Sequence, residues 1–162
     1  MVFFGRSDVG LRRQINQDCF SCMRIWGGEA VLLAVCDGMG GHKAGEIASQ
    51  KAMAVFCDKI VGNPCIEEQP EKARVAIRKT MTIAASAANR TVYEMSNRFE
   101  ELAGMGTTLV AAIVYGGVLY AINIGDSRAY IVTRREAFQI TRDHSFVQYL
   151  IKEKKLTEEE AK

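Results

Sequence analysis

Hydrophobic residues near the start of the chain fall into two short stretches separated by glycines. Residues 19–26 show the apolar alternation of a β-strand, and residues 30–36 form a continuous apolar run that is typical of a buried strand. Gly27-Gly28-Glu29 lies between them and has the composition of a turn. The pattern predicts a β-hairpin as the first element.

The apolar spacing changes to that of helices after residue 44. A first helix is predicted from 44 to about 61, where Gly62-Asn63-Pro64 ends it. A longer helix is predicted from near Pro70, a residue that suits a first helical turn. Its apolar stripe advances by three or four residues and consists of Ala73, Ile77, Met81, Ala84, Ala88, Val92, Met95 and Phe99.

A second β region follows Gly104-Met105-Gly106. Strands are predicted over residues 107–115, 118–124, 128–133 and 137–141. Gly116-Gly117 is a two-residue hairpin signal, and such short connections make neighbouring strands antiparallel. Two β regions separated by two helices place the chain in the α+β class.

The last residues predict further helices. Residues 145–155 have a helical pattern, and Thr157-Glu158-Glu159-Glu160 is a capping box that starts another helix. Because natural domains seldom stop one turn into a helix, we expect residues 1–162 to be a single, incomplete domain.

The composition is that of a globular protein, with 48% hydrophobic and 25% charged residues and a net charge of +2. This balance does not favour a nucleic-acid or membrane surface. The N-terminal apolar run is too short for a signal peptide, and no stretch approaches the ~18 apolar residues of a membrane helix. We therefore expect a cytoplasmic protein.

The five cysteines agree with a reducing compartment, since their number is odd. Cys36 and Cys57 lie inside apolar patterns, as small core residues do. Cys19-Phe20-Ser21-Cys22 is formally a C-x-x-C sequence, but strand alternation and the lack of a second cysteine pair favour a structural role over a zinc site.

Polar residues gather at four predicted strand ends or turns. The groups are Ser7-Asp8-Val9-Gly10 with Arg12-Arg13 and Asn16-Gln17-Asp18; Asp37-Gly38-Met39-Gly40-Gly41-His42; Gly106-Thr107-Thr108; and Asn123 to Tyr130 with Thr141-Arg142-Asp143-His144-Ser145.

Three carboxylates stand out in these groups, because a charge at a strand end is costly unless it is paired or binds a metal. Asp18, Asp37 and Asp126 come without a His or Cys cluster, and oxygen ligands alone select Mg²⁺, Mn²⁺ or Ca²⁺ over zinc. Arg12 and Arg13 could supply a bidentate phosphate clamp. Hard metals and an arginine clamp together suggest phosphate-ester chemistry.

Two competing phosphate motifs do not fit. A P-loop requires Gly-Lys-Ser or Gly-Lys-Thr, whereas Lys43 follows His42 and precedes Ala44. A dinucleotide fingerprint that starts at Gly38 would need glycine at position 43.

Five motifs in order resemble those of the metal-dependent protein phosphatases of the 2C type, and most closely their bacterial serine/threonine branch. They are Ser-Asp-x-Gly-x-x-Arg-x-x-Asn-Gln-Asp, Asp-Gly-Met-Gly-Gly-His, Gly-Thr-Thr, Gly-Asp-Ser-Arg-Ala-Tyr and Asp-His-Ser, between Ser7 and Ser145. The resemblance implies an α-β-β-α sandwich of two antiparallel sheets flanked by helices, of which this chain would be the N-terminal portion.

The resemblance also implies site residues. Asp37 matches the aspartate that bridges two Mn²⁺ or Mg²⁺ ions, Gly38 the residue whose carbonyl binds one of them, and Asp18 the position that holds a metal through water. A hydroxide between the metals would attack phosphorus. Arg13 matches the arginine that grips the substrate phosphate.

Other roles stay open. His42 could donate a proton to the leaving alkoxide, position the substrate or anchor its loop. Asp126 matches a position linked to a third metal in bacterial relatives, but it could instead stabilise its turn. Arg128 and Asp143 are expected to form a structural ion pair at a strand end, and Thr107 and Thr108 to satisfy buried backbone groups.

The family's further metal-binding aspartates are absent after Ser145. We therefore expect the complete protein to dephosphorylate phosphoserine and phosphothreonine proteins, including a cognate kinase, and this chain alone to be inactive. The alternative is a non-catalytic binding or regulatory module derived from the same fold. A third hypothesis is that two chains complete each other's sheets through unpaired strand edges.

Overall fold

The computed structural model describes residues 1–41, 44–65, 67 and 69–144. In chain order its helices and strands are β1 (Asp18–Ile25), β2 (Ala30–Met39), α1 (Ala44–Val61), α2 (Pro70–Arg98), β3 (Gly106–Thr107), β4 (Leu109–Tyr115), β5 (Val118–Ile124), β6 (Tyr130–Val132) and β7 (Ala137–Gln139). The helices predicted from residue 145 onwards lie outside the described residues.

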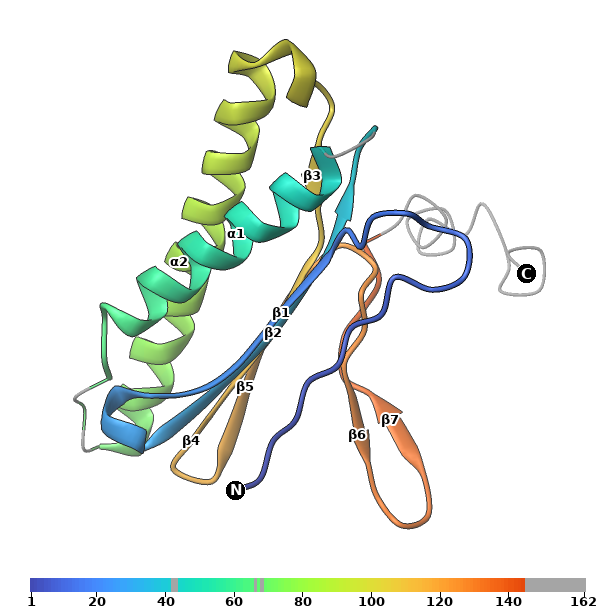
Figure 1. The fold of residues 1–162 in the computed structure, drawn as a ribbon. Helices are drawn as coiled ribbons and strands as arrows, with labels where there is room; N and C mark the ends of the chain where they lie inside the picture. Colours follow the sequence, from blue (N-terminus) through green and yellow to red (C-terminus); the bar gives the residue numbers. More distant parts are fainter. Residues whose placement is uncertain (42–43, 66, 68, 145–162) are drawn as a thin grey trace, which may run out of the picture.

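The strands form two antiparallel sheets (Figure 1). The larger has five strands in the order β1-β2-β4-β5, with β3 also paired to β2, and the smaller is the β6–β7 hairpin. The predicted β1–β2 and β4–β5 hairpins are confirmed, as is the α+β class with two antiparallel sheets and two long helices.

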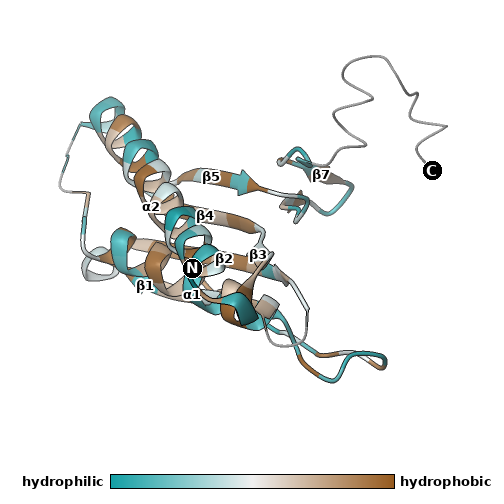
Figure 2. Cartoon of the chain, turned by 90° about the horizontal axis from the view of Figure 1, so that it is seen from above, coloured by the Kyte–Doolittle hydropathy of each residue, from teal (hydrophilic) through white to brown (hydrophobic). Residues whose placement is uncertain are grey.

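Both helices cover the same face of the larger sheet (Figure 1). Because side chains alternate between the faces of a strand, Cys19 and Met23 of β1 point into this helix-covered core, whereas Phe20 lies on the opposite face. The largest fully buried side chains of this core are Phe56, Leu32, Ile60, Ile77, Met81 and Ile113. In Figure 2 the central strands of this sheet are largely brown, as expected for a sheet that forms the centre of the core.

The apolar stripe predicted for the long helix is confirmed from Ala73 to Val92, all of whose members are buried. The prediction is wrong at Phe99, which is 39% exposed. The helix ends at Arg98, and the Arg98 guanidinium lies over the Phe99 ring, 5.4 Å from its centroid. In the part of the chain that the structure describes, no helix combines the length and apolarity needed to cross a membrane.

The face of the larger sheet away from the helices keeps exposed apolar side chains. Phe20, Val35 and Leu119 are 40%, 43% and 43% exposed. The N-terminal segment runs beside β1 on this face, because Gly5 closely approaches the Phe20 ring and Arg24 donates a hydrogen bond to the Met1 carbonyl. This segment leaves part of the apolar face in contact with solvent.

Trp26 connects the β1–β2 turn to α1. Its indole N–H donates to the Ile60 carbonyl at 2.9 Å, in the last turn of the helix. Its ring also meets Tyr115 edge-on, with 5.9 Å between the centroids. The end of the sheet is thereby tied to the end of α1.

The strand predicted over residues 107–115 is divided in the structure at Thr108. Strands β3 and β4 pair with β2 in the same register, so the strand path continues through the interruption. At Thr108 the side-chain hydroxyl, rather than the backbone carbonyl, accepts the hydrogen bond from the Asp37 N–H. The strands β6 and β7 are also shorter than predicted. Beyond their open end the Thr141 hydroxyl accepts the hydrogen bond of the Ala129 N–H.

Candidate active site

A pair of carboxylates lies at the open end of the β1–β2 hairpin. Asp18 and Asp37 are direct partners in the β1–β2 register, so both side chains lie on the face of the sheet away from the helices. Both residues are exposed. Side chains that oppose each other in an antiparallel pair lie close together, and the hairpin therefore brings two of the predicted metal ligands to one point.

The backbone of Asp37 is held on both sides by a threonine pair. Its N–H donates to Thr108 Oγ1 at 2.9 Å, and its carbonyl accepts from the Thr108 N–H and from Thr107 Oγ1, each at 2.9 Å. These contacts confirm that Thr107 and Thr108 satisfy backbone groups beside the site. They fix the strand end from which the Asp37 side chain projects.

A cavity of about 240 Å³ opens at the carboxylate pair. Four predicted site residues line it, namely Arg13, Asp18, Asp37 and Gly38. The cavity therefore brings the predicted phosphate-binding arginine and three of the predicted metal-binding positions together.

Asp8 lines the same cavity, although sequence reasoning gave it no role. Its carboxylate accepts a hydrogen bond from the Gly10 N–H at 2.8 Å, which closes a tight turn in the cavity wall. The signal that marks Asp8 in the sequence is the Ser7-Asp8-Val9-Gly10 motif. That motif predicts a turn, and the position of the turn in the cavity wall emerges only from the fold.

The segment before β1 is held in place by its own polar side chains. Asn16 Nδ2 donates to Ser7 Oγ at 2.7 Å, and Asn16 Oδ1 accepts from the Asp18 N–H at 3.0 Å. The Gln17 carbonyl accepts from the Gly38 N–H at 3.0 Å. These hydrogen bonds between motif residues hold the wall of the cavity against the start of β1.

Gly38 is buried where β2 passes the start of α1. A Cβ at this position would lie 2.0 Å from the Gly45 carbonyl oxygen and 2.7 Å from the Gln17 carbonyl oxygen. Any side chain at this position would therefore collide with backbone atoms, whose displacement would disturb the start of α1 and the cavity wall. Glycine at position 38 lets the helix and the cavity wall approach the carboxylate pair.

The local electrostatics favour a cation. Burial and the negative charges of Asp18 and Asp126 raise the pKa of Asp37, and the positive charge of Arg13 partly offsets them. Carboxylates whose charge is only partly compensated resist full ionisation, and a bound cation would relieve that repulsion.

Asp126 lies in the turn that follows β5 and is exposed. Among the described residues it is not part of the cavity lining around Asp37, but its charge acts on Asp37. Its neighbour Ser127 makes a 2.7 Å hydroxyl–hydroxyl hydrogen bond with Thr108. His42 lies outside the described residues.

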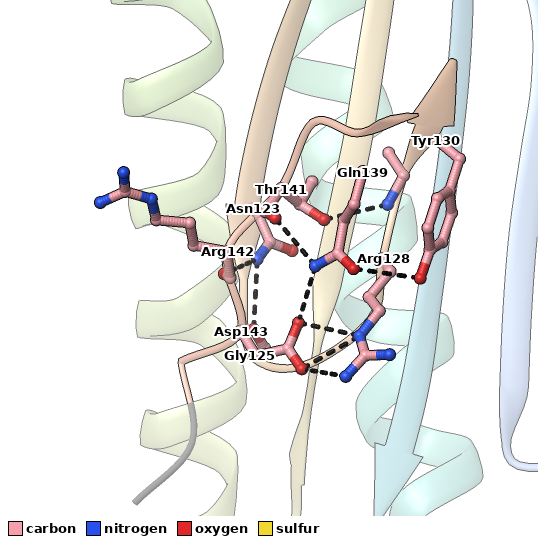
Figure 3. Close-up of polar contacts among 9 residues, drawn as sticks. Asn123, Gly125, Arg128, Tyr130, Gln139, Thr141, Arg142 and Asp143 are labelled. Atoms are coloured by element: carbon pink, nitrogen blue, oxygen red, sulfur yellow. Dashed lines mark hydrogen bonds and ion pairs between the residues drawn. The ribbon is translucent and has the colours of Figure 1, made fainter. Parts of the chain in front are cut away.

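The predicted ion pair between Arg128 and Asp143 is confirmed (Figure 3). Arg128 Nε and Nη2 donate to the Asp143 carboxylate at 3.0 and 2.6 Å, and these hydrogen bonds lower the pKa of Asp143. Gln139 Nε2 donates to the Thr141 carbonyl at 2.9 Å in the same network. The network ties the β6–β7 hairpin to residues 141–144.

The donors at the carboxylate pair fit a hard divalent cation. Asp18, Asp37 and the Gly38 carbonyl offer oxygen atoms only, which is the donor set that Mg²⁺ and Mn²⁺ prefer. Within the described residues, no three His, Cys, Asp or Glu side chains come together as a metal-binding group.

Comparison with known proteins gives consistent matches. The profile of the protein phosphatase 2C family matches residues 11–161. The serine/threonine protein phosphatase PstP of Mycobacterium tuberculosis is 38% identical over 159 residues, which are 98% of this chain and 28% of that protein.

Solved structures agree. The serine/threonine phosphatase of S. agalactiae superposes with a TM-score of 0.81 at 35% identity, covering 94% of this chain and 60% of that one. The catalytic domain of PstP in complex with two manganese ions gives a TM-score of 0.75 at 37% identity, covering 96% of this chain and 61% of that one. The chain thus spans less than two thirds of the length of these relatives.

Proposed function

The chain belongs to the protein phosphatase 2C family, and from this premise we propose that the complete protein removes phosphate from phosphoserine and phosphothreonine side chains of proteins with the help of divalent cations. The observation that carries the proposal is the Asp18–Asp37 pair in one cavity with Arg13. Carboxylates for a cation and a guanidinium for a phosphate then face the same space.

Each of these residues has a distinct proposed task. Asp37, the Gly38 carbonyl and Asp18 hold the cations, and Arg13 binds and orients the substrate phosphate. Bound cations supply a hydroxide nucleophile at neutral pH and stabilise charge on the phosphoryl oxygens. His42 is proposed to donate a proton to the leaving oxygen.

We also propose the number and kind of the cations. Two Mn²⁺ or Mg²⁺ ions would bind at Asp37, and a third at Asp126. The manganese in the PstP catalytic domain supports Mn²⁺ as the first ion to test.

Residues 1–162 are proposed to be part of a single phosphatase domain that further residues complete. The coverage of about 60% of the solved relatives supports this. A cognate serine/threonine kinase is a proposed substrate, and the five free cysteines support a reducing, cytoplasmic location.

Hydrolysis of a phosphothreonine peptide by the full-length protein tests the proposal. Turnover should require Mn²⁺ and stop with a chelator. Asp37→Asn should lower kcat at least about 100-fold because a cation ligand is lost, whereas Asp58→Asn, which changes an exposed aspartate on α1, should leave it unchanged.

The arginine is tested separately. Arg13→Ala should raise KM for the peptide more than it weakens Mn²⁺ binding, and Arg78→Ala on the exposed side of α2 serves as the control. Turnover that persists without any divalent cation would contradict the proposed mechanism.

The second candidate function is a non-catalytic binding module. The absence of a three-ligand metal group within the described residues favours it for this chain taken alone. Binding of the phosphopeptide by the 162-residue chain without hydrolysis, in Mn²⁺, would support this candidate over catalysis by the chain itself.

A further inference from the structure

Two hydroxyl groups join the strand end of Asp37 to the turn of Asp126. Thr108 Oγ1 accepts the Asp37 N–H at 2.9 Å and shares a 2.7 Å hydrogen bond with Ser127 Oγ. Ser127 directly follows Asp126 in the chain. A short hydrogen-bonded path therefore connects the two predicted cation ligands.

The turn also packs directly on Thr108. Gly125 has a φ of +98°, and a Cβ there would lie 2.7 Å from Thr108 Cγ2. Thr108 itself is only 9% exposed. A hydroxyl pair shielded in this way is stronger than one in water, because the local dielectric is low.

The other side of the same turn is anchored as well (Figure 3). The Gly125 carbonyl accepts from the His144 N–H at 2.9 Å and from Asn123 Nδ2 at 3.2 Å. The Arg128–Asp143 ion pair follows immediately after Ser127. The turn is therefore fixed at both ends. The Thr108–Ser127 hydrogen bond connects it, through Thr108, to the backbone of Asp37.

We propose that Thr108 and Ser127 are positioning residues, which act as one relay that sets the Asp126 turn relative to Asp37 for cation binding. The proposal rests on the proposed function, since it assumes that both carboxylates serve bound cations. Neither hydroxyl is assigned a contact with the cation or the substrate. Ser127 acts on Asp37 only through Thr108.

A double-mutant cycle in the full-length protein tests the relay, with Mn²⁺ alone as the probe and water-proton relaxation as the measure of its affinity. Ser127→Ala and Thr108→Val should each weaken Mn²⁺ binding about three- to tenfold, the range of one hydrogen bond. In the Thr108→Val background, Ser127→Ala should have no further effect. Ser127→Thr keeps the hydroxyl and should retain the affinity.

Thr107→Val provides the matched control, because it removes the hydroxyl that donates to the Asp37 and Thr108 carbonyls and leaves the hydroxyls of Thr108 and Ser127 in place. In that background Ser127→Ala should still have its full effect. Independent, multiplying losses for Ser127→Ala and Thr108→Val would overturn the proposal. So would an unchanged Mn²⁺ affinity accompanied only by lower stability in urea, which is the result of a merely structural role.

Failure of the proposed function gives a different result, namely no Mn²⁺ binding by the full-length wild-type protein. The relay is then judged in metal-free protein by hydrogen exchange of the Asp37 N–H. Ser127→Ala should raise that exchange rate about three- to tenfold. An unchanged rate would overturn the relay.

Discussion

At the scale of single residues, the surroundings of Asp37 depend on a glycine and a hydroxyl group that other residues cannot replace. Gly38 is in contact with the Gly45 and Gln17 carbonyls, and Thr108 replaces a backbone acceptor with its hydroxyl. The sequence predicts a strand over residues 30–36, whereas β2 continues through Asp37 to Met39. The contact of Gly38 with Gly45 depends on where α1 begins. Such a contact follows from tertiary packing and has no local signal.

Gly38→Ala should lower the free energy of unfolding by about 3 kcal/mol or more, because its Cβ would overlap two backbone oxygens. Urea denaturation measures the change. Gly41→Ala is the control, since nothing lies within 4 Å of a Cβ at that position, and its effect should stay within about 1 kcal/mol. Equal losses in the two variants would contradict the packing argument.

Asp37→Asn should stabilise the metal-free chain near neutral pH. Burial and the charges of Asp18 and Asp126 raise the pKa of Asp37, so its contribution to stability is present below the ordinary value of 3.8 and is lost as the pH rises through the raised pKa. The gain should stay below about 1 kcal/mol because solvent screens this exposed pair.

Urea denaturation across the pH range, with chelator present, measures this difference, which should vanish below pH 3.8. Under the proposed function, saturating Mn²⁺ should reverse the order of stability in the full-length protein, because a cation held by Asp37 would stabilise the folded wild-type protein. A variant less stable than wild type near neutral pH without metal would contradict the sign.

At the scale of elements, the hairpins and helices follow from local patterns, and the exceptions follow from helix ends and side-chain hydrogen bonds. The α2 stripe is confirmed as far as Val92, and Phe99 departs from it where the helix ends. The predicted strand over residues 107–115 is interrupted at Thr108 by a side-chain acceptor. Periodicity predicts which face of an element is apolar, but it does not reveal a hydroxyl that takes over a backbone bond.

The β6–β7 hairpin should loosen in acid. The hydrogen bonds of Arg128 lower the pKa of Asp143, so the stabilisation is present above the ordinary value of 3.8 and is lost as the pH falls through the lowered pKa. Hydrogen exchange of residues 130–139 as a function of pH measures the opening. Arg128→Gln should raise the exchange at neutral pH and remove its acid dependence, whereas Arg134→Gln at the hairpin turn should do neither.

At the scale of the whole molecule, one face of the larger sheet is packed and the other is only partly covered. The resemblance predicted the two antiparallel sheets and grouped Arg13, Asp18, Asp37 and Gly38, which line one cavity. Asp126 is related to them through the Thr108–Ser127 hydrogen bond. The order of the motifs predicts which residues belong to the site. The contacts that connect these residues depend on the three-dimensional fold.

The 162-residue chain should associate with itself at high concentration through the exposed apolar face and the strand edges. Multi-angle light scattering over a dilution series measures the mass. Val35→Thr with Leu119→Thr should shift the chain toward monomer, since both side chains lie on that face. Val75→Thr on the solvent side of α2 is the control, and an equal shift there would contradict a role for the sheet face.

Trp26 gives the chain an intrinsic optical reporter. It is the sole tryptophan, and it joins the end of the β1–β2 hairpin to the last turn of α1. The strand length places it roughly 25 Å from Asp18, at the opposite end of β1. Its emission should therefore change when the helix docks on the sheet and should be unaffected by ligands at the carboxylates. Fluorescence can then distinguish folding from binding in a single sample.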